Sequence, residues 1–159
     1  MIKIIYLILL TLPTLTNVHT DLPDMSLKGA DGKMYELQKD FADKDKLYIF
    51  SFWATWCVPC LAELDEINDQ YDDWKKELNI ELIAVATDDA RTEKRVKPLA
   101  TGKGWSYRIL FDSNQELKRR LGIVDVPHTI VVKNNKIVYT HSGYSPGDET
   151  ELFEKLKTL

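Results

Sequence analysis

Residues 47–60 read LYIFSFWATWCVPC, and this stretch decides the fold. Its first part, residues 47–53, is a nearly unbroken apolar run, which predicts a short strand buried on both faces. From Pro59 onward, apolar residues recur every three or four positions with acidic residues between them, which indicates an amphipathic helix. The apolar positions of this helix are Leu61, Leu64, Ile67, Tyr71, Trp74 and Leu78. A second buried strand is expected at 80–87, so the core begins as a β-α-β unit with parallel strands.

The flanking sequence predicts further strands and helices around this unit. Asp31-Gly32 separates two short runs and predicts an N-terminal β-hairpin, and the polar segment 88–105 predicts an inserted helix and loop after the second core strand. The remaining expected elements are a strand at 107–111, a helix at 114–121 with a Ser113/Glu116 capping box and Gly122 at its end, a hairpin of 129–133 and 136–141 around Asn134-Asn135, and a last helix with Ser145 as N-cap and Pro146 in its first turn. This order predicts a three-layer α/β/α domain with a mixed central sheet.

Length and composition limit the classes of protein that fit. The chain has 159 residues, which suits one domain. Its 21 basic and 25 acidic residues give a formal net charge of −4, which argues against nucleic-acid binding because a phosphate backbone requires a basic face. With 2 cysteines, the chain cannot be a disulfide-rich scaffold.

The start of the chain has the pattern of a secretory signal. A lysine precedes a mostly apolar run over 4–12, a proline ends that run, and a short polar stretch follows. The run is well short of the roughly 20 residues that a membrane-spanning helix needs. We therefore expect 1–20 to be a signal peptide, 21–159 to be the folded domain, and the protein to be exported. A retained anchor and a buried N-terminal element are the alternatives.

The two cysteines, Cys57 and Cys60, are spaced C-x-x-C at the junction between the buried strand and the helix. Pro59 suits the first helical turn, where its missing N–H would have no intrahelical partner. Unpaired amides and the positive end of the helix dipole stabilise a thiolate there, and cysteines in such settings have a pKa of about 3.5–7.5 instead of about 8.5. We interpret Cys57 as the nucleophile and Cys60 as the resolving thiol.

Two other roles for the cysteine pair are weaker. A structural disulfide would close a very short loop, for which the chain-entropy model gives only about 2 kcal/mol. A zinc site needs further ligands, and His19, His128 and His141 lack paired spacing. The sequence contains no metal, nucleotide or flavin motif. Redox chemistry with the dithiol as its own carrier, without metal or other cofactor, is therefore the favoured interpretation.

Residues 53–60 resemble the active-site motif of thioredoxin-fold proteins. The T-W-C-x-P-C form, together with Glu63, is similar to the TlpA/ResA-like thiol–disulfide oxidoreductases of bacterial envelopes, and the resemblance covers about residues 22–159. It implies a thioredoxin fold, and the leading hairpin and the inserted segment resemble the same subgroup.

Glu63 lies three residues after Cys60, so one helical face carries both. A carboxylate partly buried beside Cys60 would have a raised pKa and could take the proton of that thiol. Many thioredoxins instead place an acid on the strand six residues before the first cysteine, where this chain has Ser51. Glu63 matches the acid of the subgroup. The alternative is an exposed glutamate that only favours the helix dipole.

The resemblance also implies a substrate-binding surface. Val126-Pro127 occupies the place of the family's cis-proline loop, which faces the cysteines and in which the residue before the proline offers its backbone to the substrate. The alternative is a trans proline that starts a strand. Beside the nucleophile, Trp56 is expected to border an apolar contact surface, with Val58 and Pro59 also assigned to substrate binding. Trp53 is expected in the core.

One departure from the family pattern follows the proline. His128 stands where a small residue is expected, and it either titrates near the site or is an exposed strand residue.

These observations predict an exported, monomeric thiol–disulfide oxidoreductase whose substrates are protein thiols and disulfides in the cell envelope. The resemblance implies a reductase supplied by a membrane electron donor, in cytochrome c maturation or envelope redox homeostasis. A thiol peroxidase is one alternative, although no proline shortly precedes Cys57 as the peroxiredoxin pattern requires. A redox-inert binding module is the other.

Overall fold

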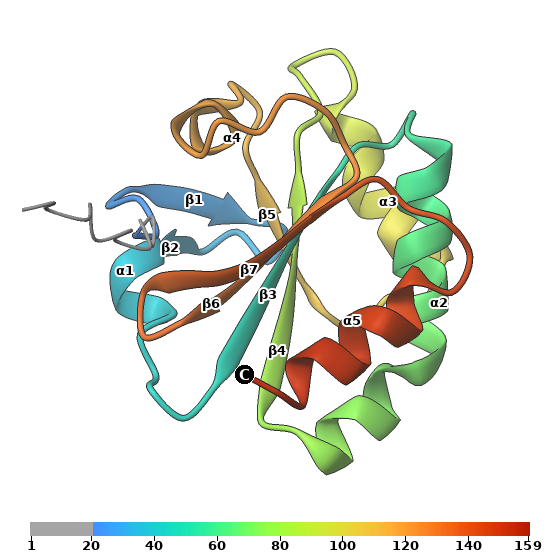
Figure 1. Ribbon diagram of the computed structural model, residues 1–159. Helices are drawn as coiled ribbons and strands as arrows, with labels where there is room; N and C mark the ends of the chain where they lie inside the picture. Colours follow the sequence, from blue (N-terminus) through green and yellow to red (C-terminus); the bar gives the residue numbers. More distant parts are fainter. Residues whose placement is uncertain (1–20) are drawn as a thin grey trace, which may run out of the picture.

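The computed structural model describes residues 21–159, so the expected signal peptide lies outside the described residues. A seven-stranded sheet forms the middle layer, with helices on both faces (Figure 1). In chain order the elements are β1 (Ser26–Gly29), β2 (Met34–Glu36), α1 (Leu37–Asp40), β3 (Leu47–Trp53), α2 (Val58–Glu77), β4 (Ile80–Ala86), the 3-10 helix η1 (Glu93–Arg95), α3 (Val96–Gly102), β5 (Arg108–Phe111), α4 (Glu116–Arg120), β6 (His128–Lys133), β7 (Lys136–Ser142) and α5 (Asp148–Leu156). None of these described helices is long and apolar enough to cross a membrane.

The sheet has the mixed topology that the sequence predicts. Its strands lie in the order β2-β1-β5-β4-β3-β6-β7. β3, β4 and β5 run parallel, whereas β1 pairs antiparallel with β2 and β5, and β6 pairs antiparallel with β3 and β7. The β3-α2-β4 unit is the β-α-β beginning expected from residues 47–87.

The central strands are buried because helices cover both faces of the sheet. Every residue of β3 is buried, and its side chains alternate between two apolar layers. One layer lies under α2, α3 and α5 and contains Trp53 and Leu64. The other lies under α1 and α4 and contains Phe50 and Phe52. The position of Trp53 in the core is therefore confirmed.

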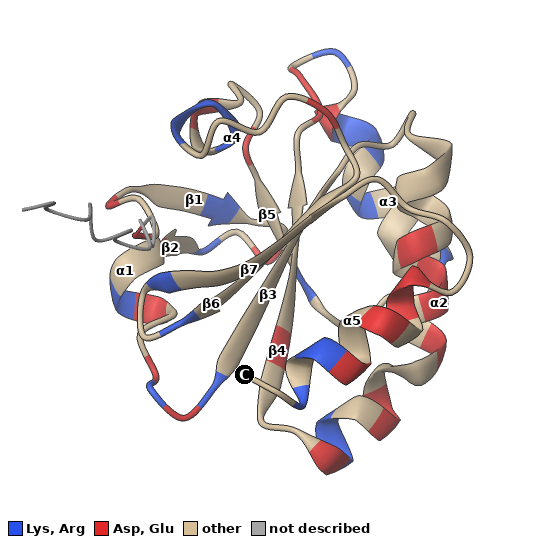
Figure 2. Ribbon diagram, in the orientation of Figure 1, with Lys and Arg blue, Asp and Glu red and all other residues tan. Residues whose placement is uncertain are grey.

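Helix α2 buries its apolar stripe, and most of its acidic residues are exposed. Figure 2 shows acidic residues recurring along this helix. The buried positions are Cys60, Glu63, Leu64, Ile67, Tyr71 and Trp74. Glu63 is the one acidic side chain among these buried positions of α2. This placement sets it apart from the solvated acids on the same helix.

Two turns expected from the sequence are confirmed. Asn134 and Asn135, in the turn between β6 and β7, have φ values of 50° and 60°. Gly122, just after α4, has a φ of 68° and its N–H bonds to the carbonyl of Arg119. These left-handed conformations suit asparagine and glycine, so both turns end their elements where the sequence places them.

The start of α4 differs from the sequence prediction. The capping box of Ser113 with Glu116 is wrong, because the Ser113 hydroxyl donates to Glu93 instead. The cap comes from Asp112, a buried residue after β5, whose carboxylate accepts from two backbone N–H groups of the helix at 3.1 and 2.9 Å. α4 is accordingly shorter than the expected helix over 114–121.

The start of α5 also differs. The expected helix has Ser145 as N-cap and Pro146 in its first turn, but α5 begins at Asp148 with Gly147 as N-cap. The Ser145 N–H donates to the Asp148 carboxylate at 2.7 Å, and the Asp148 N–H donates to the Ser145 carbonyl at 3.0 Å. These two bonds close a separate turn, and Gly147 (φ 107°) leaves it to enter the helix.

Replacing Asp112 tests the observed cap of α4. Asp112→Ala should lower the free energy of unfolding by about 1–2 kcal/mol, because two helical N–H groups lose their acceptor. Ser113→Ala is the matched control and should cost less, since that hydroxyl caps no helical N–H. Urea denaturation followed by circular dichroism measures both values. A larger loss for Ser113→Ala would contradict the assignment.

Candidate active site

The two cysteines form a disulfide where β3 leads into α2. Cys57 is the N-cap of α2, immediately before the first turn in which the sequence placed it, and its Sγ accepts the backbone N–H of Cys60 at 3.3 Å. Pro59 lies in the first turn, as expected. Cys57 is 5% exposed and Cys60 is 0% exposed. Cys57 is thus the more exposed of the two cysteines.

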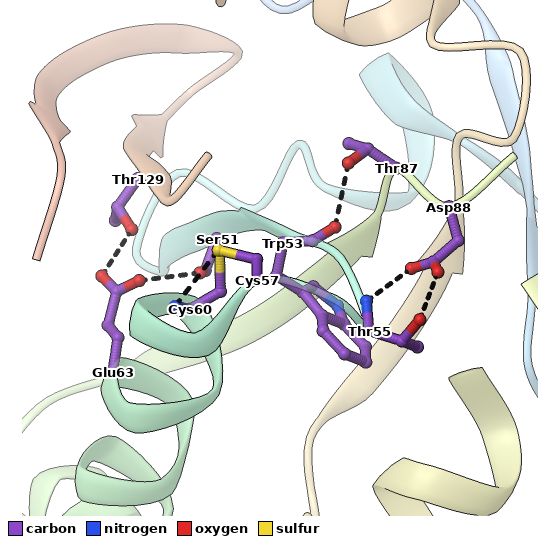
Figure 3. The surroundings of a disulfide bond; sticks show 9 residues. All are labelled: Ser51, Trp53, Thr55, Cys57, Cys60, Glu63, Thr87, Asp88 and Thr129. Atoms are coloured by element: carbon purple, nitrogen blue, oxygen red, sulfur yellow. Dashed lines mark hydrogen bonds between the residues drawn. A yellow bond between two sulfur atoms is a disulfide. The ribbon is translucent and has the colours of Figure 1, made fainter. Parts of the chain in front are cut away.

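The loop that carries Cys57 is anchored to the end of β4 (Figure 3). The carbonyl of Trp53 accepts from the N–H of Thr87 at 2.8 Å and from its hydroxyl at 3.0 Å. Thr55 donates its N–H to Asp88 at 2.9 Å and its hydroxyl at 2.5 Å. The register that aligns Trp53 with Ala86 brings these residues together.

Glu63 is buried beside the turn that carries Cys60 (Figure 3). It is 4% exposed, so the alternative of a solvated first-turn glutamate is wrong. Its carboxyl accepts from the hydroxyl of Thr129 on β6 at 3.0 Å and from that of Ser51 on β3 at 3.5 Å. Ser51, which stands where many thioredoxins place an acid on the strand, therefore contacts Glu63 on α2.

Burial raises the pKa of Glu63 to about 7. Loss of hydration disfavours the carboxylate, and the nearby carboxylate of Asp148 adds to the rise. The hydrogen bond from Thr129, the proximity of His141 and the hydrogen bond from Ser51 oppose it. A carboxyl with this pKa both accepts and releases a proton near neutral pH.

The loop before β6 has the geometry that the resemblance implied. The Val126-Pro127 peptide bond is cis. Pro127 is buried and Val126 is half-buried, and the carbonyl of Pro127 accepts the N–H of Gly143 at 2.9 Å. The next residue, His128, is half-buried with its Nδ1 2.7 Å from the Ser142 hydroxyl. Burial lowers the pKa of His128.

His128 behaves as a strand residue of β6. Thr129 points toward Glu63, and alternation along a strand turns its neighbour His128 to the opposite face. Its observed partner is Ser142 on β7. Of the two sequence interpretations, the structure therefore favours the strand residue, although His128 is half-buried and the expected exposure is wrong.

Large apolar side chains are exposed in the segments that carry the cysteines and the cis-proline. Trp56 is 63% exposed and Val58 is 75% exposed, while Pro59 between Val58 and Cys60 is also exposed. Val124 is 78% exposed in the loop before Val126. Val124 was not among the residues predicted from the sequence. Its apolar side chain in a loop close to the cis-proline was the signal that could have identified it.

Other site residues were also missed by sequence reasoning. Thr129 and Asp88 are 66 and 33 positions away from the residues they contact, Glu63 and Thr55. A threonine in a strand and an aspartate after one are common, so no local pattern marks them. Within residues 21–159, no group of three or more histidine, cysteine or acidic side chains is placed to hold a metal ion.

Comparison with known proteins places the chain in a family. The model of the AhpC/TSA family matches residues 18–141. The chain belongs to this family. It is 28% identical to "Thiol-disulfide oxidoreductase ResA" of Bacillus thuringiensis subsp. konkukian, over 84% of this chain and 74% of that relative.

Solved structures share the fold of this chain. An uncharacterized thioredoxin-like protein from Porphyromonas gingivalis superposes with a TM-score of 0.76 at 44% identity, covering 87% of this chain and 90% of that one. A putative thiol:disulfide interchange protein DsbE from Chlorobium tepidum gives a TM-score of 0.75 at 21% identity, covering 88% and 95%, which shows the fold alone. The predicted thioredoxin fold and the ResA-like resemblance are confirmed.

The raised pKa of Glu63 makes stability depend on pH. The folded-state value of about 7 lies above the ordinary value of 4.5, so the unfolded chain releases this proton first and stability falls as pH rises between these values. The free energy of unfolding of Glu63→Gln, measured relative to that of the wild type, should therefore be higher at pH 8 than at pH 4 by on the order of 3 kcal/mol. Urea denaturation of the oxidised protein at both values measures the gain.

The exposed Glu66, one turn further along α2, provides the control for this experiment. Glu66→Gln also removes one acidic side chain, but this side chain is exposed and loses little hydration on folding. Its free energy of unfolding relative to the wild type should therefore show no comparable increase between pH 4 and pH 8. Equal pH profiles for the two variants would overturn the buried-carboxyl interpretation.

Proposed function

We propose that this chain is a thioredoxin-like thiol–disulfide oxidoreductase that exchanges its Cys57–Cys60 pair with the disulfides of protein substrates. The observation that carries the proposal is the position of the pair at the start of α2, with Cys57 as the N-cap and as the more exposed cysteine. The name of the ResA relatives supports the same enzyme class.

The reaction consists of two exchanges. In the reduced protein, the Cys57 thiolate attacks one sulfur of a substrate disulfide, and the other substrate sulfur leaves as a thiolate. Cys60 then loses its proton and attacks the Cys57 sulfur of the mixed disulfide, so the second substrate sulfur leaves. Two electrons pass to the substrate, and the product is the Cys57–Cys60 disulfide present in the structure.

Glu63 is the proton acceptor for Cys60 in this scheme. Both residues lie on the buried face of α2, and the pKa of Glu63 near 7 lets it take a thiol proton and later return it. Thr129 and Ser51 hold the carboxyl in place through their hydroxyl groups. Cys60 is fully buried, so bulk water is a poor alternative acceptor.

The substrate contacts the apolar residues around the accessible sulfur. Trp56, Val58 and Pro59 flank Cys57 with exposed apolar surface, and Val126 and Pro127 supply the cis-proline loop. Apolar surface without fixed polar partners accepts many sequences, which suits an enzyme that recognises disulfides in different proteins.

The direction and location of the reaction are part of the proposal. The signal-like pattern of 1–20 and the resemblance to ResA-like proteins support export to the cell envelope and action as a monomeric reductase. A dithiol donor in the membrane would then regenerate the reduced pair. Cytochrome c maturation or envelope redox homeostasis is the process that the resemblance favours.

Reduction and trapping of a defined substrate test the activity. With dithiothreitol as electron donor, the wild type should accelerate reduction of a disulfide-bonded peptide, and Cys57→Ser should abolish the acceleration. Cys60→Ser should accumulate a mixed disulfide between Cys57 and the peptide, because the resolving thiol is absent. Mass spectrometry identifies the adduct.

Two results would replace this function by another. Rapid peroxide consumption with dithiothreitol, without peptide reduction, would favour a thiol peroxidase. Neither activity, together with unchanged partner binding by Cys57→Ser, would favour a redox-inert binding module.

Kinetics of Glu63→Gln test the proton acceptor. The variant should slow peptide-disulfide reduction about tenfold or more near pH 7 and lose the dependence of the rate on a group that titrates near pH 7. Glu66→Gln should keep the wild-type profile. Stopped-flow rates between pH 5 and pH 9 measure both, and coincident profiles for Glu63→Gln and the wild type would remove the role.

A further inference from the structure

A second buried carboxylate lies close to the cysteine loop and has no part in the proposed reaction. Asp88 directly follows Thr87 at the end of β4 and is 0% exposed. Both of its carboxylate oxygens accept from one residue, Thr55, whose N–H lies at 2.9 Å and whose hydroxyl lies at 2.5 Å (Figure 3). Thr55 stands two positions before Cys57.

These bonds fix the loop on the side of the nucleophile. On the other side, Thr87 holds the carbonyl of Trp53 with its N–H and its hydroxyl. Between the two anchors, the carbonyl of Ala54 accepts the N–H of Cys57 at 3.0 Å. The backbone that leads into Cys57 is thus held from the end of β4, while the intervening Trp56 stays exposed.

The importance of these anchors depends on the redox state. In the oxidised protein, the bond between Cys57 and Cys60 itself keeps the first sulfur against the helix. In the reduced protein that bond is gone. The loop contacts, together with the N–H of Leu61 that donates to the Cys57 carbonyl at 3.1 Å, then keep the Cys57 sulfur beside the N–H of Cys60. The stabilisation of a thiolate by a helix N-terminus falls off within the first turn, so small displacements matter.

We propose that Asp88 is a positioning residue which, through Thr55, holds the reduced Cys57 at the N-terminus of α2. This inference rests on the proposed role of Cys57 as the nucleophile. A carboxylate suits the task because it accepts from two donors at once, whereas an asparagine amide has one acceptor oxygen and turns N–H groups toward the second donor.

Asp112 provides a matched control within the same sheet. It follows the neighbouring parallel strand β5, is also buried, and also accepts two hydrogen bonds, but from N–H groups of α4. Replacing it removes a buried capping carboxylate without touching the cysteine loop. If Asp88→Asn changes the reactivity of Cys57 and Asp112→Asn does not, the change is therefore specific to the contact between Asp88 and Thr55.

The test is the rate at which iodoacetamide alkylates Cys57 in the reduced full chain between pH 4 and pH 10, with the modified peptide identified by mass spectrometry. The rate follows the thiolate fraction. Thr55→Val keeps the Asp88 charge but loses the hydroxyl donor, and it should slow alkylation at pH 7 about three- to tenfold. Thr55→Ser keeps the donor and should stay within about twofold of the wild type.

Asp88→Asn separates positioning from charge. Removing a nearby negative charge by itself favours the thiolate and would speed alkylation. The anchor role predicts slower alkylation instead, and the double variant Thr55→Val with Asp88→Asn should be no slower than the slower single variant, because both act through one contact. Asp112→Asn should leave the alkylation profile unchanged.

Wild-type profiles for Thr55→Val and Asp88→Asn, or faster alkylation of Asp88→Asn, would overturn the inference. If Asp88→Asn does not fold, the comparison of Thr55→Val with Thr55→Ser decides alone. The readout needs no protein substrate, so failure of the wild type to reduce peptide disulfides would refute the proposed function separately from the role of Asp88.

Discussion

The active site depends on the parallel pairing of β3 with β4. The register runs from Leu47 opposite Ile80 to Trp53 opposite Ala86, so both strands end at the same edge of the sheet. Both strands are buried, and polar groups at their ends must therefore find partners within the protein. The loop after β3 forms hydrogen bonds with Thr87 and Asp88, the residues after β4. These bonds hold the segment that leads to the cysteines at the start of α2.

Two buried carboxyl groups near the cysteines have different surroundings. Within residues 21–159, Glu63 accepts only from hydroxyl groups, those of Thr129 and Ser51, and the second of these bonds is long at 3.5 Å. Such weak compensation for lost hydration leaves its pKa near 7, which suits a group that exchanges a proton. Asp88 accepts two bonds from Thr55, at 2.9 Å from the N–H and 2.5 Å from the hydroxyl, an arrangement that suits a fixed attachment point for the loop.

Local signals predicted the elements well and their caps less well. The buried runs and the helical period of α2 depend on neighbouring residues in the chain, so the β3-α2-β4 unit was predictable. The cap of α4 was mispredicted because Glu93, 20 positions away, takes the hydroxyl of Ser113 and leaves Asp112 as the cap. The turn that Ser145 forms with Asp148 likewise delays the start of α5.

The sequence alone determined the strand, the helix and the C-x-x-C pair at their junction, because spacing and periodicity are properties of a continuous segment. Only the tertiary structure decided that Glu63 is buried and that Asp88 reaches the cysteine loop. Whether a carboxyl group keeps its hydration, and which donors replace it, depends on strands that come from distant parts of the chain. The packing of the sheet sets those surroundings, and burial there raises the pKa of Glu63.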